Sequence, residues 1–176
     1  DEMSNINNHD IYRQAGENES YLCSLIREDS VKEFVRYITQ ESISLSDTRI
    51  PFSIFETNSF LIKKPPTLIE YAAFYGSIKI FQYLLLNHVD IESSSLWFYA
   101  IHSNNADIIN QLEEHCKIDA REYEECYKEA IKCHHNDIAI YIKDNLMEQN
   151  LKEDEITINS FFQEKWIRGS PIIGKD

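Results

Sequence analysis

The feature that most constrains this chain is an internal repeat. The segment 66–91 aligns without gaps on 96–114 after a shift of 28 residues, and on 126–142 after a further shift of 30. A comparable upstream copy occupies 22–38. Periods between 20 and 50 residues are typical of solenoids, because one unit cannot bury its apolar face without a neighbour. The sequence therefore predicts a stack of similar units.

Each copy has the pattern of two helices joined by a tight turn. Apolar residues at i, i+3 and i+4 spacing lie on both sides of Gly76, and glycine is favoured where a helix ends in a left-handed conformation. The same slot holds Asp29, Asn104 and His134, residues that tolerate left-handed backbone. A second slot holds small side chains that allow close helix contact: Ala72, Ala100 and Ala130.

The clearest copy carries a family resemblance. The segment 67–73 (TLIEYAA), followed by Gly76, resembles the ankyrin signature Thr-Pro-Leu-His-x-Ala-Ala followed by Gly, and 88–91 (HVDI) stands where ankyrins place Gly-Ala-Asp-Val. Leu68 replaces the proline, Glu70 replaces the histidine, and the periods are shorter than the usual value of about 33. In these respects the chain is similar to the divergent ankyrin-like class abundant in large protist protein families.

The resemblance implies an all-α, ankyrin-like helix-turn-helix solenoid with one long loop insertion. It covers about residues 20–146. The expected layout is a polar N-terminal segment at 1–18 and one repeat domain at 19–168, followed by a tail at 169–176. Within the domain we expect repeats at about 20–38, 66–91, 95–116 and 124–146, an insertion at 39–65, and a capping helix at about 154–168 with Ile158, Phe161, Phe162 and Trp166 on one face.

The insertion is rich in apolar side chains that alternate with polar ones. Alternation at Ile43/Leu45, Phe52/Ile54 and Phe60/Ile62 predicts short extended segments rather than a helix. Because so much apolar surface is unsuited to water, the insertion either packs on the stack or binds a partner.

Composition excludes several functions. With only 4 glycines, the chain has no phosphate-binding glycine loop and no nucleophile elbow. A net charge of −13 opposes binding to nucleic acid and to anionic membranes, and it reflects either solubility or a basic partner. No apolar run reaches the roughly 20 residues of a membrane span, and the start of the chain does not resemble a signal peptide. We expect a cytoplasmic protein.

Cysteine and histidine allow three interpretations. His115, Cys116, Cys126, Cys133, His134 and His135 could supply zinc ligands, but no close pair such as C-x2-C is present. The repeat itself accounts for Cys126 and His134, which occupy the slots of Leu68 and Gly76. We therefore expect structural cysteines, with zinc binding and a reactive thiol as alternatives. No motif places a nucleophile beside the histidines, so we predict no enzyme activity, no metal and no cofactor.

The function expected from these patterns is protein–protein interaction, with a structural subunit of a larger cytoskeletal or multi-protein assembly as the alternative. Such a subunit would dock through the insertion and the C-terminal helix. In ankyrin-like stacks the two residues before the turn face a concave groove. The resemblance therefore implies a partner-binding surface formed by Arg27-Glu28, Phe74-Tyr75, His102-Ser103 and Lys132-Cys133. The two aromatic residues are either binding anchors or core residues covered by the insertion. No small-molecule substrate is expected.

Overall fold

The computed structural model of the chain describes residues 10–147. This part of the chain is mostly helical and contains no strand; its β pairing is an isolated antiparallel bridge between Arg49 and Thr67. The predicted all-α class is therefore confirmed. Among the described helices, none has the length and apolar content that crossing a bilayer requires. The expected capping helix at 154–168, the tail at 169–176 and residues 1–9 lie outside the described residues.

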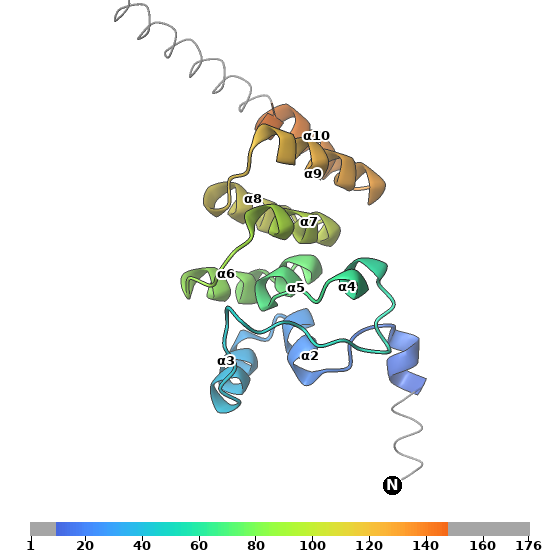
Figure 1. Cartoon of the computed structure of the whole chain (residues 1–176), viewed down its shortest axis with the longest axis vertical. Coiled ribbons are helices and arrows are strands. Elements are labelled where there is room, and N and C mark those ends of the chain that lie inside the picture. Colours follow the sequence, from blue (N-terminus) through green and yellow to red (C-terminus); the bar gives the residue numbers. More distant parts are fainter. Residues whose placement is uncertain (1–9, 148–176) are drawn as a thin grey trace, which may run out of the picture. The chain divides into compact units, whose positions relative to one another are not determined.

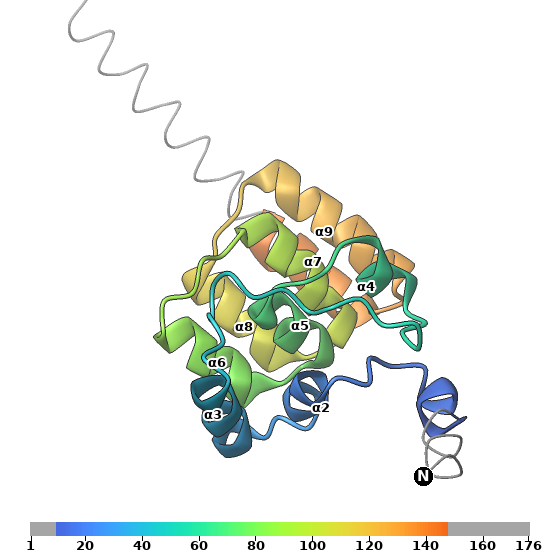
Figure 2. The same ribbon diagram turned by 60° about the horizontal axis from the view of Figure 1, so that its bottom comes forward.

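The chain divides into two compact units on either side of the Lys117–Ile118 bond. The sequence had predicted a single repeat domain over this range. In unit 1, three helix pairs form two rows, as Figures 1 and 2 show. The first helices of the pairs lie side by side in one row, and the second helices form the other row. The first row is α2 (Tyr21–Arg27), α5 (Leu68–Tyr75) and α7 (Ser93–Ser103), and the second is α3 (Val31–Gln40), α6 (Ile78–Leu86) and α8 (Ala106–His115).

Unit 2 contains one further helix pair, α9 (Ala120–Lys132) and α10 (Asn136–Tyr141), which continues into a π-helix, η1 (Ile142–Met147). The start of α9 is fixed by a capping box, in which the Asp119 carboxylate accepts from the Glu122 N–H and the Glu122 carboxylate accepts from the Asp119 N–H. Thr67 and Glu70 form the same box at the start of α5. Thus one local signal begins a first helix in each unit.

All four predicted turn residues have left-handed backbone. The φ angles are 51° at Asp29, 69° at Gly76, 52° at Asn104 and 60° at His134. In three of the turns the residue after the left-handed one donates its N–H to a carbonyl five residues earlier, which closes a Schellman motif. These bonds are Ser30 to Leu25 (3.0 Å), Ser77 to Ala72 (3.0 Å) and His135 to Ala130 (2.9 Å). The turn prediction is therefore confirmed.

Hydrogen bonds join the first and second turns of unit 1. The Asp29 carboxylate accepts from the backbone N–H groups of Lys79 and Ile80, at 3.2 and 2.9 Å. It thereby caps α6, whose own N-cap residue, Ser77, makes no side-chain cap. The Ser77 hydroxyl instead donates to the Ile26 carbonyl at 2.6 Å. The first turn thus supplies the cap of the second pair.

The second and third turns are joined in a similar way. The Asn105 side-chain amide donates to the Gly76 carbonyl at 3.2 Å, while its oxygen accepts from the N–H groups of Asp107 and Ile108 at the start of α8. One side chain therefore caps its own helix and binds the preceding turn. The three turns of unit 1 are connected by polar contacts as well as by apolar packing.

The insertion at 39–65 belongs to unit 1 and packs on its helix pairs. Part of the structure predicted for the insertion is wrong. Phe60 and Ile62, expected in an extended segment, lie in a short helix, α4 (Ser59–Lys63), because the Asn58 side chain accepts from the Phe60 N–H and caps its start. Ile50 and Leu61 are buried, and the Ile50 N–H donates to the Pro66 carbonyl at 2.8 Å. Figure 2 shows the insertion crossing in front of α5.

Residues 10–18 also belong to this packed structure, whereas the sequence places them in a polar segment outside the domain. Residues 10–15 are helical, and the Tyr12 ring lies 5.6 Å from the Phe55 ring. Asn18 is buried and donates to the Pro51 carbonyl at 2.8 Å. The insertion is thus held from both sides, by α5 and by the N-terminal segment.

The alanine slot provides a test of the packing. Ala72, Ala100 and Ala130 are each fully buried. We expect Ala100→Leu to overpack the helix contact and to lower the free energy of unfolding by roughly 1–3 kcal/mol, measured by urea denaturation. Ala106→Leu, at an exposed position of α8, is the matched control and is expected to change stability little. Equal effects of the two substitutions would contradict the assigned register.

The contact between the first two turns provides a second test. Asp29→Ala removes the cap of α6 and places a β-carbon in left-handed backbone, so we expect a loss of about 1–3 kcal/mol. Asp29→Asn keeps an acceptor oxygen and a residue that tolerates this conformation, so it should retain most of that stability. An unchanged urea midpoint in Asp29→Ala would show that the cap does not form.

Candidate functional site

The structure places all eight predicted partner-binding residues at the ends of first helices, next to the left-handed turn. Glu28 and Lys132 are exposed, and the other six are half-buried: Arg27, Phe74, Tyr75, His102, Ser103 and Cys133. Six of the eight belong to unit 1, and Lys132 and Cys133 belong to unit 2. Their surroundings show which of them are available to a partner.

An aromatic side chain of the insertion covers part of this surface. The Phe60 ring lies 6.2 Å from the Phe74 ring and nearly parallel to it, and 4.2 Å from the His102 ring. It also meets Tyr99 edge-on at 4.8 Å. Phe74 and His102 stack on each other at 5.4 Å. We call Phe60, Phe74, Tyr99 and His102 the aromatic cluster. In this cluster the insertion acts as a cover, as the second of the two interpretations of Phe74 expects.

Tyr75 belongs to a polar network beside the cluster. The Arg27 guanidinium lies 5.8 Å from the centre of the Tyr75 ring and donates to the Tyr71 hydroxyl at 2.9 Å. It also donates to the Asn18 carbonyl at 2.9 Å and pairs with the Glu17 carboxylate at 2.9 Å. Arg27 therefore spans α2, α5 and the N-terminal segment, and these bonds fix its guanidinium in place.

The thiol and the two phenol groups around Arg27 are held neutral. Burial raises the pKa of Tyr75 to about 12 and that of the Cys23 thiol to about 11, and it also raises the pKa of Tyr71. A thiol or phenol becomes a nucleophile or a base only when it ionises. At neutral pH this network therefore offers hydrogen bonds and aromatic surface, not an activated nucleophile.

Ser103 has a structural role in the third turn. Its hydroxyl donates to the Ala100 carbonyl at 2.7 Å and accepts from the Asn105 N–H at 3.2 Å. This hydroxyl bridges the two groups that bond directly in the other three turns. The predicted binding residue Ser103 thus helps to close the turn.

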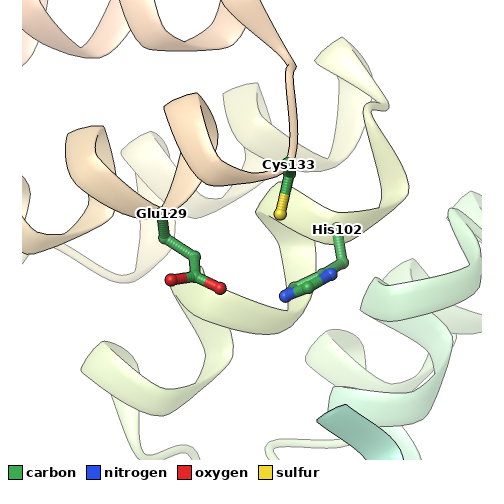
Figure 3. Close-up of side chains that lie close together, drawn as sticks. All are labelled: His102, Glu129 and Cys133. Atoms are coloured by element: carbon green, nitrogen blue, oxygen red, sulfur yellow. The ribbon is translucent and has the colours of Figure 1, made fainter. Parts of the chain in front are cut away.

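In unit 2, the two predicted residues lie at the end of α9. The Lys132 ammonium pairs with the Glu129 carboxylate at 3.0 Å across one helical turn. Figure 3 shows Glu129 on the last turn of α9 and Cys133 just after the end of that helix; it also labels His102 on α7. Burial raises the pKa of Cys133, and the neighbouring Glu129 raises it further. Of the two predicted residues in unit 2, Lys132 is exposed and Cys133 is half-buried.

The other cysteines are packed in the helical core. Cys23, Cys116 and Cys126 are buried, and burial raises the pKa of Cys126 to about 12. His134, one of the possible zinc ligands, occupies the left-handed turn. Among the described residues, neither unit on its own brings three of the six possible zinc ligands within reach of one ion. The core packing expected for the cysteines holds for these three.

Two positions that sequence analysis did not select contribute to the site. Phe60 and Tyr99 complete the aromatic cluster. In the sequence, Phe60 was noted only because it alternates with Ile62, and Tyr99 was not noted. The helix cap at Asn58 is the sequence signal that places Phe60 on α4. No sequence signal marks Tyr99 as a site residue, because a tyrosine within an apolar helix is expected to be a core residue.

Thiol reactivity tests the burial of the cysteines. Below its pKa a thiol is protonated and reacts slowly, so Cys23 and Cys126 should resist iodoacetamide at pH 8 in the folded protein. In urea all four cysteines should be alkylated, as measured by peptide mass spectrometry. Modification of Cys23 or Cys126 in the folded protein at the rate of a free thiol would contradict this burial.

A double-mutant cycle tests the cover over Phe74. Phe60→Ala and Phe74→Ala should each destabilise the protein, and their combination should reveal a coupling of about 0.5–1.5 kcal/mol. The pair Phe52→Ala and Phe74→Ala is the control from the same insertion, because Phe52 is 72% exposed. A coupling near zero for Phe60 and Phe74 would mean that the insertion does not cover this surface.

Comparison of the chain with models of known protein families, with curated proteins and with solved structures found no match in any of the three.

Proposed function

We propose that the chain is a non-enzymatic protein–protein interaction module built from ankyrin-like repeats. The observation that carries this proposal is that a left-handed residue recurs in the same slot of all four copies, while the two residues before it differ in every copy. A repeated scaffold with variable neighbouring side chains is the arrangement by which repeat proteins build extended binding surfaces.

The chemistry of the site supports binding rather than catalysis. The tyrosines and thiols next to Arg27 are neutral at physiological pH because they are buried, and Arg27 itself is paired with Glu17. Ring contacts and hydrogen bonds hold these groups in place. Such a surface provides shape and apolar contact, and aromatic side chains are frequent anchors at protein interfaces.

The partner surface in this proposal lies on unit 1 and combines the end of α2, where Glu28 is exposed, with the outer face of the insertion. In unit 2, the exposed Lys132 at the end of α9 is a separate candidate contact. Phe74 then supports the surface through its ring contact with Phe60 of the insertion, and Tyr75 packs against Phe74. A cytoplasmic setting is part of the proposal, in keeping with four cysteines that form no disulfide.

A structural subunit of a cytoskeletal or other multi-protein assembly is the second candidate. It is favoured by the exposed Phe52 and Ile54 of the insertion, which a permanent neighbour would cover. The two candidates differ in whether the chain exists free. In native extract, a module would elute in part near its own mass of 20.7 kDa, whereas a permanent subunit would elute only with its assembly.

Affinity capture followed by mass spectrometry tests the proposed function. The full chain should retain a protein partner, and Glu28→Lys should weaken this capture while the melting temperature stays within about 2 °C of the wild type, since exposed substitutions change stability little. Phe74→Ala/Tyr75→Ala should lower both capture and stability. If the full chain retains no protein, or if Glu28→Lys is without effect, the proposed surface is wrong.

A further inference from the structure

The outer face of the insertion has an inverted polarity. Phe52 and Ile54 are 72% and 76% exposed, whereas Ser53 between them is 3% exposed. In an extended segment alternate side chains point to opposite faces, so a shift of one residue would bury the two apolar side chains. At this point the insertion therefore presents Phe52 and Ile54 to solvent and Ser53 to the interior.

Specific hydrogen bonds hold this inverted arrangement. The Ser53 hydroxyl donates to the Glu19 carboxylate and accepts from the Phe55 N–H at 3.0 Å. The Asn18 amide donates to the carbonyl of Pro51, two residues before Ser53, at 2.8 Å. Because the N-terminal segment and the insertion both contribute, the exposure of Phe52 and Ile54 is built into the fold.

The backbone at Phe52, just before the chain bends at Ile54, is available for pairing. Within the part of the chain that the structure describes, neither Phe52 nor Ile54 donates or accepts a hydrogen bond. Exposed extended backbone with free N–H and C=O groups can pair with another extended chain, and alternate side chains then provide specificity. The cavity beneath Phe52, lined also by Ile50, Leu61 and Tyr71, measures only about 30 Å³. A ligand would therefore lie across this surface rather than enter it.

Two carboxylates beside these apolar residues lack a cation. Glu19 accepts from Ser53, and Glu56 accepts from the Asn58 N–H at 2.9 Å while its other oxygen is buried without a donor. Neither forms an ion pair with a described residue. Glu19 is exposed and within reach of a ligand's cation, whereas Glu56 adds negative charge from beneath the surface. In a chain of net charge −13, this charge favours a basic ligand.

We propose that one surface patch, called the insertion tip, binds an extended segment of a partner protein that carries lysine or arginine next to apolar side chains. The insertion tip consists of Phe52, Ile54 and Glu56 of the insertion with Glu19 of the N-terminal segment. The apolar residues of the bound segment contact Phe52 and Ile54, and its cation lies beside the exposed Glu19 carboxylate. This inference rests on the proposed interaction function and names the kind of partner it serves.

A library of random dodecapeptides displayed on phage is the probe. The full chain should enrich peptides with apolar residues two positions apart and a neighbouring lysine or arginine. For the synthetic peptides, fluorescence polarisation should show a loss of affinity of about tenfold or more with Phe52→Ser/Ile54→Ser, as expected for interface anchors. Glu19→Gln/Glu56→Gln should weaken binding and reduce its dependence on salt.

Leu86→Ser is the matched control, because Leu86 is equally exposed, at 78%, on α6. It should leave peptide affinity unchanged. The melting temperature of each variant separates lost binding from lost folding.

Several results would overturn the proposal: no enrichment, enrichment of acidic peptides, or equal binding to all variants. Peptides whose affinity depends on Glu28 and not on Phe52 or Ile54 would leave the interaction function standing and remove this site. Sedimentation with phosphatidylcholine vesicles that is lost in Phe52→Ser/Ile54→Ser would also overturn it, because the tip would then bind lipid.

Discussion

The structure depends on one backbone constraint, the left-handed residue that ends the first helix of each pair. At this residue the chain must leave the helix and reverse, and the following N–H closes the turn on the helix it has just left. Only a residue that tolerates positive φ can stand there, which explains Asp29, Gly76, Asn104 and His134. In unit 1 the same turns carry the polar contacts between neighbouring pairs, through Asp29, Ser77 and Asn105. Pair formation and pair stacking thus share one set of residues.

The sequence predicted what is local and missed what depends on distant residues. The left-handed slot and the small alanines follow from conformational preference and side-chain size, and both predictions are confirmed. The cap of α6 could not be predicted, because the Asp29 carboxylate accepts a hydrogen bond from the N–H of Ile80, 51 residues further along the chain. In the insertion, alternation at Phe60 and Ile62 suggested an extended segment, but a helix of five residues is too short to show its own period. The cap at Asn58 was the better signal.

The residues predicted to bind a partner remain a prediction as a site, and the sequence did not predict what surrounds them. The residues before each turn lie where the sequence placed them, yet Phe74 is covered by Phe60 and Ser103 closes its turn. Both outcomes depend on contacts with segments that no repeat pattern describes. The insertion meets the first of its two alternatives, because Ile50 and Leu61 are buried. Phe52 and Ile54 remain exposed, and partner binding by the insertion stays a proposal. Burial of serine between two exposed apolar residues is a tertiary effect, and hydropathy alone predicts the reverse.

The four copies share one turn conformation, which backbone φ angles measured by NMR in solution can test. Three-bond HN–Hα and one-bond Cα–Hα couplings distinguish left-handed from right-handed helical backbone at each residue. The account predicts positive φ at Asp29, Gly76, Asn104 and His134 together, with slow hydrogen exchange at the Ser30, Ser77 and His135 amides that close the turns. Right-handed φ at Asn104 or His134 would contradict the repeat register and the interaction module built on it.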